Sequence, residues 1–569
     1  MTTLDATLAT LTQHKDEWAT LPIRRKIDYL ELLRDKTDKV AERWVTAAAK
    51  AKKIPADSPL VGEEWISGPW ALIKGLNVLI RSLDALNHGT TTYDPDAVRE
   101  RADGQVVVDV FPSNFFDRLV LSGFSAEVWM QPGVTRENLA ENTASFYRNP
   151  APEGKVALVL GAGNIASIAP LDVLYKMFAD GTVCVLKMNP VNDYLGPFFE
   201  EIFVPLVSAG YLGFAYGGAD VGGELVAHEA VDEIHVTGDY RTYNAIVFGM
   251  GEDGERRRVA DTPVMTKPVT AELGNVSATI VVPGPWTDDD IQFQAEHIVT
   301  QKSHNAGFNC IATQVLVLPA QWEKTDELTS AVRSTMKKTP PREPYYPGAD
   351  RRQSGALSAH PEAELIDSSS SVALPRMLIT GLDSQDDSEY CFNNEFFSNV
   401  LSVTSLPGNS AVEYLENAVA FANEKLWGTL GITLLIHPRT IKELGTALDD
   451  AVARLKFGCI GINAWIGAGF LFAETPWGAF PGHARNDIRS GTGVAHNGLL
   501  FDKPQKSVVR QPFYPFPRNL LHGEMHLSPK PAWFVTHRRE HDVGRRFTRF
   551  EARPGLRHLP GLFLAALRG

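Results

Sequence analysis

The chain is poor in cysteine and has no long apolar run. Its 569 residues include 4 cysteines, at positions 184, 310, 391 and 459, and no two have the CxxC spacing. They predict neither a disulfide framework nor a thiolate zinc site, and we expect no metal. No apolar run reaches the ~20 residues that a membrane-spanning helix needs, and the start lacks the basic flank and apolar core of a signal peptide. We therefore expect a cytoplasmic protein with no membrane span.

The chain also has fewer basic than acidic residues, 55 Lys and Arg against 68 Asp and Glu. The formal net charge is −13 at pH 7, which argues against general affinity for nucleic acid or for anionic membranes. The rest of the composition, 44% hydrophobic and 22% charged, is ordinary for a globular protein with a sizeable interior. A chain of this length exceeds one simple core, so two or three domains are expected.

The first part of the chain shows two sequence patterns, one typical of helices and one typical of strands. Residues 15–90 are predicted to form helices, because apolar residues recur at three- and four-residue spacing in IRRKIDYLELLRDKTDKVAERW. Between about 98 and 133, β-branched and aromatic residues predict two strands, in GQVVVDVFPSN and SAEVWMQPGV, which would form a hairpin-like insertion.

Strands and helices alternate from residue 155 onward. Buried-type strands such as KVALVLGAG and GTVCVLKMNP are separated by amphipathic stretches such as IAPLDVLYKMFAD, which predicts a parallel sheet with right-handed crossovers. Ligands of such sheets lie beyond the carboxyl ends of the strands. A second alternating region covers about 273–475 and includes the predicted helix TIKELGTALDDAVARL. Residues 338–375, which contain TPPREPYYPGADRRQSG and IDSSSS, are polar and are predicted to form a surface loop.

Four short fragments contain residues that could carry chemistry: GAGN (161–164), TAELGN (270–275), NAGFNC (305–310) and NEFFSN (394–399). Taken singly, each has an ordinary structural explanation, and a lone cysteine is more often a small buried hydrophobe than a nucleophile. A thiol that attacks a carbonyl carbon needs surroundings that favour thiolate, donors for the developing oxyanion, and a base that activates water. Cys310, Asn164 and Glu272 would supply the thiol, an amide donor and the base.

These fragments, in this order, resemble motifs of the aldehyde dehydrogenase superfamily, and the resemblance extends from about residue 15 to 500. TAELGN is similar to its E-L-G-G segment, NAGFNC to N-x-G-Q-x-C, and NEFFSNV to E-x-F-G-P-V. The resemblance implies that Cys310 is the catalytic thiol, Glu272 the general base and Asn164 the oxyanion donor.

The resemblance also implies NAD or NADP as the cofactor. Lys187 in VLKMNP matches the lysine that holds the adenosine ribose, and Thr237 and Gly238 match a cofactor-facing turn. Glu395 and Phe397 match the residues that bind the nicotinamide ribose and pack on the nicotinamide side.

Several positions depart from the family pattern. Asp239 and Tyr243 replace small residues of the cofactor-facing turn, and a carboxylate there would repel a pyrophosphate unless it is neutralised or turned away. Pro190 replaces an acid that binds the ribose in many relatives, so the preference between NAD and NADP stays open. Asn275 and Val276 replace the residues that follow E-L-G in the family.

GAGN lacks the Pro-Trp of typical relatives and is nearer to the acyl-CoA reductase and CoA-acylating branches. Those branches generally lack the base that Glu272 supplies here. The leading hypothesis is oxidation of an aldehyde to a carboxylic acid through a thiohemiacetal and a thioester on Cys310. The alternatives are reduction of an acyl thioester and a catalytically silent scaffold.

The resemblance implies an aldehyde dehydrogenase-like α/β fold, with a Rossmann-type cofactor domain and a second α/β catalytic domain. The predicted parts are a helical N-terminal region with the cofactor domain (1–272), a hairpin-like insertion within it (103–148), a catalytic thiol domain (273–475), a return segment (476–500) and a basic C-terminal extension (501–569). The extension is expected to pack on the acidic body or on a neighbouring subunit, in preference to acting as a nucleic-acid arm. Relatives imply a homo-oligomer.

Overall fold

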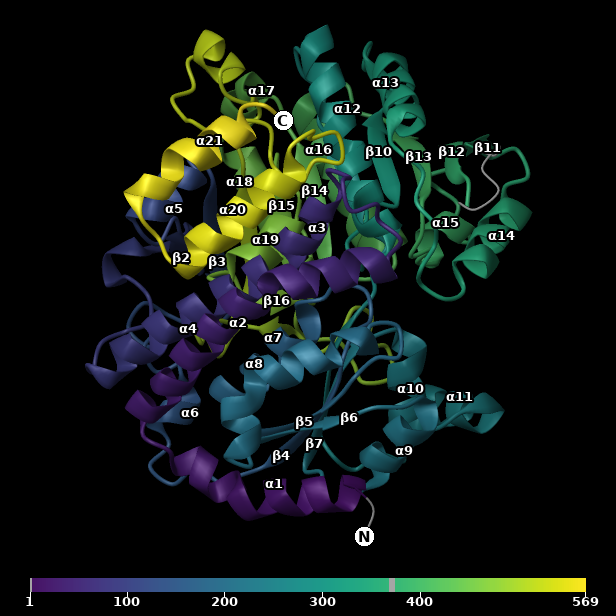
Figure 1. Ribbon diagram of the computed structural model, residues 1–569. Coiled ribbons are helices and arrows are strands. Elements are labelled where there is room, and N and C mark those ends of the chain that lie inside the picture. The colour runs from purple at the N-terminus through teal and green to yellow at the C-terminus, as the bar shows by residue number, and fades with distance from the viewer. Residues whose placement is uncertain (1–2, 368–373) are drawn as a thin grey trace.

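The computed structural model describes residues 3–367 and 374–569. Two β-sheets dominate it, one above the other in Figure 1, with N-terminal helices running between and beneath them. These helices are α1 (Thr3–Thr20), α2 (Ile23–Ala51), α3 (Val61–Trp65), a π-helical turn (Ile66–Trp70) and α4 (Ala71–Asn87). Among the described residues, no helix combines the length and the apolar character needed to cross a membrane.

The smaller sheet is parallel throughout, as its alternating sequence predicts. Its strand order is β6-β5-β4-β7-β8. The strands are β4 (Val156–Leu160), β5 (Val183–Lys187), β6 (Leu212–Ala215), β7 (Glu233–Gly238) and β8 (Val269–Leu273). The helices along this part of the chain are α7 (Ile168–Phe178), α8 (Gly196–Ser208), α9 (Ala219–Ala227), α10 (Tyr240–Phe248) and α11 (Gly251–Val259).

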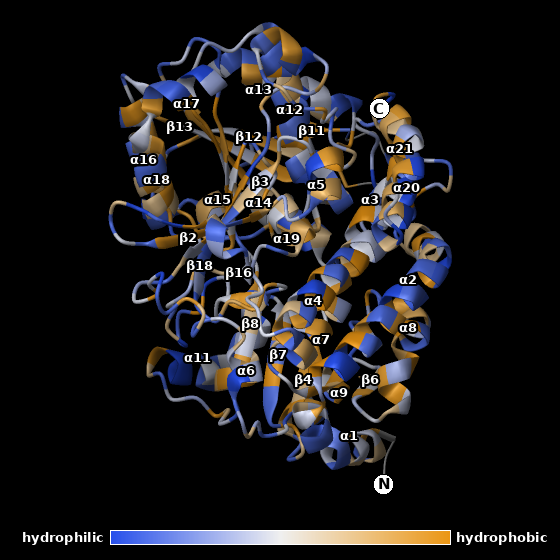
Figure 2. Cartoon of the chain, turned by 90° about the vertical axis from the view of Figure 1, so that its left-hand side faces the viewer, coloured by the Kyte–Doolittle hydropathy of each residue, from blue (hydrophilic) through white to orange (hydrophobic). Residues whose placement is uncertain are grey.

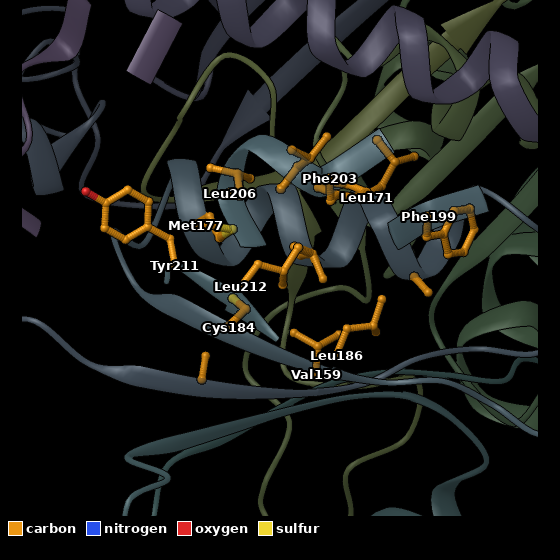
Figure 3. Packing of buried hydrophobic residues seen from close by; sticks show 14 of the residues in the cluster. Val159, Leu171, Met177, Cys184, Leu186, Phe199, Phe203, Leu206, Tyr211 and Leu212 are labelled. Carbon is orange, nitrogen blue, oxygen red and sulfur yellow. The ribbon is translucent and has the colours of Figure 1, made fainter. Parts of the chain in front are cut away.

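Apolar side chains join this sheet to the helices on one face. Figure 3 shows Leu171 of α7 and Phe203 of α8 above Val159 of β4 and Leu186 of β5. Cys184 lies in the same layer and is buried, as its place in an apolar strand predicts. In contrast, α11 is almost wholly hydrophilic and projects from the side of the sheet (Figure 2).

The larger sheet has the strand order β1-β2-β3-β18-β15-β14-β9-β10-β13-β12-β11. The strands from β18 to β12 are parallel, and β1, β2, β3 and β11 join antiparallel at the two edges. In chain order the strands are β1 (Val98–Glu100), β2 (Val106–Phe111), β3 (Ser125–Met130), β9 (Ala278–Val281), β10 (Val315–Pro319), β11 (Glu364–Ile366), β12 (Arg376–Leu382), β13 (Val400–Leu406), β14 (Gly431–Leu435), β15 (Cys459–Ile462) and β18 (Pro504–Arg510).

Helices cover this sheet and its edges (Figure 1). They are α5 (Phe115–Val120), α12 (Asp288–Ser303), α13 (Thr325–Lys338), α14 (Ala349–Ala359), α15 (Tyr390–Asn393), α16 (Ala411–Lys425), α17 (Pro438–Leu444), α18 (Thr446–Arg454), α19 (Gly467–Phe472), α20 (Glu540–Ala552) and α21 (Leu559–Ala566). The short helix α6 (Ser145–Arg148) belongs to the smaller domain, where the Tyr147 hydroxyl donates to the Phe178 carbonyl at 2.5 Å. A short ladder of β16 (Trp477–Gly478) and β17 (Val494–His496) brings the return segment against β8, where Gly491 pairs with Glu272.

Two sequence predictions about local structure were wrong. The predicted loop 338–375 contains α14 and β11, because its polar residues form the outer face of packed elements; part of IDSSSS lies outside the described residues. The single helix predicted for TIKELGTALDDAVARL is two helices, α17 and α18. The break is at Gly445, whose φ of 51° is incompatible with a continuous right-handed helix.

The predicted extension begins inside the larger sheet. Strand β18 lies between β15 and β3, so the hairpin-like insertion joins the sheet through the C-terminal part of the same chain. Beyond β18, α20 packs on α3. Arg549 of α20 and Arg553, which follows the helix, face acidic residues of α2 and pair with Glu42 at 3.5 Å and with Asp38 at 3.4 Å, respectively. The basic segment therefore packs on the acidic body of its own chain.

Trp18 of α1 offers a test of this packing. Its side chain is fully buried, its indole N–H donates to the Met177 carbonyl at 3.0 Å, and its ring meets Phe178 edge-on at 5.2 Å. Because truncation would leave a large cavity and an unpaired carbonyl, Trp18→Ala should lower the free energy of unfolding by about 3–5 kcal/mol. Denaturant titration measures this. Gln13→Ala, on the exposed side of α1, should change it by less than about 0.5 kcal/mol; equal effects of the two would contradict the packing.

Candidate active site

One cavity of about 970 Å³ lies between the two sheets. All eight residues that the sequence motifs single out line it: Asn164, Lys187, Thr237, Gly238, Glu272, Cys310, Glu395 and Phe397. They are distant in sequence and come from different elements. The fold therefore brings them together, as the resemblance implies.

The smaller sheet supplies one wall of this cavity. Each of its strands reaches the cavity at or just beyond its carboxyl end: Gly161 after β4, Lys187 in β5, Gly218 after β6, Thr237 in β7 and Glu272 in β8. This is the position where parallel α/β sheets bind ligands. The larger sheet supplies the facing wall through turns that precede its strands, which carry Cys310, Glu395 and Trp427.

The turn that carries the thiol has an unusual backbone. Asn305, Ala306 and Gly307 follow one another with φ of 54°, 56° and 79°. The left-handed region costs non-glycine residues free energy, so such a run persists only where the surroundings enforce it. At Gly307 a side chain is also excluded, since a Cβ there would lie 2.8 Å from the carbonyl carbon of Ser398. The glycine that breaks the helical pattern in the sequence is thus required by its conformation and its neighbour.

Asn305 anchors this turn to the smaller domain. Its side-chain nitrogen Nδ2 donates to the backbone carbonyl of Asn164 at 3.2 Å and to that of Phe308 at 3.0 Å. Its side-chain oxygen Oδ1 accepts from Lys52 Nζ and from the Tyr345 hydroxyl, each at 3.0 Å. All four groups hold Asn305 in place, and Lys52 is held in turn by the buried Glu64 at 2.8 Å.

Asn164 is attached to the same turn. Its Nδ2 donates to the Phe308 carbonyl at 3.0 Å, and its side chain lines the cavity beside Cys310. An amide nitrogen carries two hydrogens. One hydrogen orients the side chain, and the other is available to an oxygen in the cavity.

Glu272 is buried and unpaired. Its side chain is 1% exposed, and neither carboxylate oxygen has a hydrogen-bond partner among the described residues by geometric criteria. Burial raises the pKa of Glu272 to about 8, with a further contribution from the Asp172 carboxylate, while contacts with Cys310 and Trp477 oppose the rise. A carboxyl group that changes charge near neutral pH, inside a cavity, is suited to general-base chemistry.

Cys310 is the half-buried cysteine of the chain; the other three, all within the described residues, are buried. Burial raises the pKa of the Cys310 thiol well above its usual range, and the Glu272 and Glu395 carboxylates raise it further. This differs from the thiolate-favouring surroundings expected from the sequence. Without a positive charge nearby, the thiol keeps its proton at neutral pH.

Glu395 and Phe397 are held by polar contacts of their neighbours. The Gln314 side chain donates to the Asn394 carbonyl at 2.6 Å and accepts from the Phe396 N–H at 2.8 Å. Arg352 donates to the Phe397 carbonyl at 3.1 Å and lies over its ring at 5.8 Å. Burial raises the pKa of Glu395 to about 8.

The departures from the family pattern do not obstruct the cavity. Asp239 caps α10, accepting from the Arg241 N–H at 2.7 Å, and pairs with the Arg241 guanidinium at 3.0 Å, so its charge is partly neutralised. Tyr243 is 3% exposed and packs with Val236 and Val247. Its large side chain therefore points into a hydrophobic cluster.

Several lining residues escaped the sequence analysis, among them three aromatic or charged side chains of the cavity wall. Trp427 stands outside the recognised motifs, and Tyr346 and Arg352 lie in the segment that was predicted to be a surface loop. Nothing in the sequence singles out Arg352 among the arginines, because no short-range pattern predicts which arginine side chain lines a cavity. Thr237, although predicted, uses its hydroxyl within the protein, donating to Asp172 at 3.0 Å.

Comparisons with known proteins agree with this geometry. The model of the aldehyde dehydrogenase family matches residues 124–471, more than half of the chain. The chain belongs to the aldehyde dehydrogenase family. A probable coniferyl aldehyde dehydrogenase of Pseudomonas aeruginosa is 23% identical over 347 residues, which are 58% of this chain and 66% of that protein, slightly less than two thirds.

Solved structures share the fold of this family member. A substrate-bound AldH of Staphylococcus aureus has a TM-score of 0.58 at 15% identity, covering 90% of this chain and 94% of that one. An AldC variant of Pseudomonas syringae, in complex with NAD⁺ and octanal, has a TM-score of 0.57 at 17% identity. The match covers 90% of this chain and 89% of that one. An NADP-dependent glyceraldehyde-3-phosphate dehydrogenase of Bacillus halodurans has a TM-score of 0.57 at 16% sequence identity. The match covers 89% of this chain and 90% of that one.

The charge around Cys310 predicts a pH-dependent reactivity. Because burial and two carboxylates raise the pKa of its thiol, alkylation by iodoacetamide should be slow at pH 7 and rise about tenfold per pH unit up to pH 9. Intact-mass spectrometry follows the single modification, and Cys310→Ala serves as the blank. A rate that is already maximal at pH 7 in the cofactor-free protein would contradict the predicted pKa.

Proposed function

We propose that this protein oxidises an aldehyde to a carboxylic acid with NAD or NADP, through a thioester on Cys310. The observation that carries the proposal is the convergence of Cys310, Asn164 and Glu272 on one cavity that also contains the five residues expected to hold a dinucleotide. Family membership supports the same reaction class. The chain's own residues would carry the covalent steps.

The cavity fits a dinucleotide. Its volume of about 970 Å³ is at the upper end of the range for small-molecule sites. Lys187 lines it, and so do Gly218 and Ala219 at the start of α9, where free backbone N–H groups suit a phosphate. Asp239 is drawn to Arg241, which reduces its repulsion of an anion. When bound, the oxidised nicotinamide would accept a hydride, and its positive charge would favour the Cys310 thiolate.

Addition of the thiol to the aldehyde is the first step that the protein's residues would promote. The sulfur forms a bond to the carbonyl carbon, the carbonyl π-electrons move to oxygen, and the thiol proton leaves to solvent. The Asn164 amide and the Cys310 backbone N–H would donate to the oxyanion. Loss of one such donor costs on the order of 10²–10³ in turnover.

Release of the acid would depend on Glu272. After hydride transfer the acyl group is a thioester on Cys310. The Glu272 carboxylate takes a proton from water, the resulting hydroxide adds to the thioester carbon, and the Cys310 sulfur leaves. The two unpartnered oxygens of Glu272 are free to hold that water, which supports hydrolysis over transfer to coenzyme A.

Removal of the thiol should stop catalysis and leave the cofactor site intact. Cys310→Ala is expected to show no aldehyde-dependent NAD(P)H formation, while its cofactor affinity, measured by calorimetry, changes by less than about threefold because the five residues expected to hold the dinucleotide are unchanged. Cys184→Ala, in the buried layer beneath α7, is the matched control and should stay active. Residual oxidation above a few per cent in Cys310→Ala would contradict the proposal.

Removal of the base should slow the second half of the reaction. Glu272→Gln is expected to retain a burst of one NAD(P)H per active site and then to turn over about 10²–10⁴-fold more slowly. Since burial raises the pKa of Glu272 to about 8 and the ionised form is the base, steady-state turnover of the native enzyme should rise with pH up to about 8, whereas the variant should lose this rise. Stopped-flow absorbance separates burst from turnover.

The same variant distinguishes the CoA-acylating alternative. If added coenzyme A supports full turnover and Glu272→Gln has no effect on it, the acyl group is transferred to coenzyme A and hydrolysis is not the reaction. An undetectable affinity for NAD(H) and NADP(H) would instead favour the silent scaffold.

A further inference from the structure

A second, much smaller cavity lies on the other side of Cys310. Its volume is about 40 Å³, and Cys310 and Ile168 line both it and the large cavity, so the two meet at the thiol. Its wall is largely apolar, with the four aromatic residues Trp465, Phe470, Trp477 and Trp533 among isoleucines and a leucine. A substrate whose carbonyl carbon is at the sulfur, with the cofactor in the large cavity, would place its remaining chain here.

Trp533 comes from a part of the chain that the family does not account for. The family match ends at residue 471, and Trp533 belongs to the segment between β18 and α20. A third cavity of about 60 Å³ lies under the C-terminal helices, lined by residues such as Phe547 of α20 and Leu562 of α21. Trp533 is the residue that lines both this outer cavity and the small inner one. Its side chain therefore forms the partition between them.

The partition is held rigidly. Trp533 is 4% exposed, and its ring packs edge-on against Phe124 at 6.0 Å. The next residue, Phe534, stacks on His297 of α12 at 5.2 Å, and the Val535 N–H donates to Thr300 of α12 at 3.2 Å. Because α12 leads directly into the turn that carries Cys310, the wall and the nucleophile are fixed to the same helix.

We propose that Trp533 is a specificity-determining residue that closes the acyl end of the substrate pocket and restricts the enzyme to short, uncharged aldehydes. This inference rests on the proposed function. The small cavity has a volume of only about 40 Å³ and ends at Trp533, so it suits an acyl chain of a few heavy atoms beyond the carbonyl carbon. Butanal fits this space, whereas octanal has a chain about twice as long.

The lining also determines the chemical class. Among the described residues that line the small cavity, none is Asp, Glu, Lys or Arg. Burial lowers the pKa of His304, its one titratable ring, so this histidine is neutral at pH 7. An aldehyde with a carboxylate or phosphate at its far end would lose its hydration there and meet no opposite charge among the described residues, only neutral polar groups such as the unpaired indole N–H groups of Trp465 and Trp533. The pocket therefore selects uncharged chains.

The test compares kcat/KM for butanal and octanal in the full-length protein. The native enzyme should prefer butanal at least tenfold, since one methylene that does not fit costs a factor of about 10 or more. Trp533→Ala joins the inner and outer cavities and should raise the octanal-to-butanal ratio at least tenfold. Trp533→Phe, which keeps a smaller ring in the partition, should give a smaller increase.

Phe563→Ala is the matched control. Phe563 lines the outer cavity but not the inner one, so its truncation enlarges the outer space and leaves the partition in place. It should not change the ratio. Circular dichroism and Tm establish folding of each variant; if Trp533→Ala does not fold, Trp533→Leu replaces it in the same comparison.

The possible outcomes distinguish the proposed role of Trp533 from the proposed oxidation of aldehydes. A native enzyme that oxidises butanal, with an unchanged octanal-to-butanal ratio in folded Trp533→Ala and Trp533→Leu, overturns the role of Trp533 alone. A native enzyme that oxidises octanal as efficiently as butanal also overturns the role of Trp533 and leaves the proposed function intact. Absence of any aldehyde oxidation by the native protein overturns the proposed function and the inference together.

Discussion

The backbone of residues 305–307 is the constraint on which the candidate site depends. Three successive left-handed residues present Cys310 to the cavity, and this conformation is unfavourable unless the surroundings enforce it. Asn305 provides that enforcement, because its amide reaches the carbonyl of Asn164 while Lys52 and Tyr345 hold its oxygen. The proposed nucleophile and the proposed oxyanion donor are thus held together by one side chain.

Burial gives the same cavity its electrostatic character. Glu272 and Glu395 both line it, and desolvation raises the pKa of each to about 8. At neutral pH both carboxyl groups are then largely protonated, and burial is the main reason that the Cys310 thiol keeps its proton. The arrangement keeps the thiol quiescent until a cation approaches, and it leaves Glu272 able to change charge close to working pH.

The C-terminal part of the chain completes the larger-sheet half of the molecule. Strand β18 connects the insertion β1–β3 to the larger sheet, and the residues beyond it reach back to α12 and to the cavity beside Cys310. Its arginines face the acidic surface of α2. A segment whose composition differs from the rest of the chain therefore serves as structure for the site.

Sequence periodicity was sufficient for the strands β4 to β7 and the helices α7 to α9 of the smaller domain, because periodicity is a local property. The eight motif residues were singled out by their resemblance to the family, and they line one cavity. The same resemblance, together with the glycine-broken turn, set Cys310 apart from the other three cysteines as the candidate nucleophile. Local pattern could not show that Gly445 divides a helix, that Asp239 would pair with Arg241, or that Trp533 would close a pocket beside a thiol more than 200 residues earlier. The raised pKa of Cys310 belongs to this second group, since desolvation and charge depend on neighbours that only the packing of both sheets brings into contact.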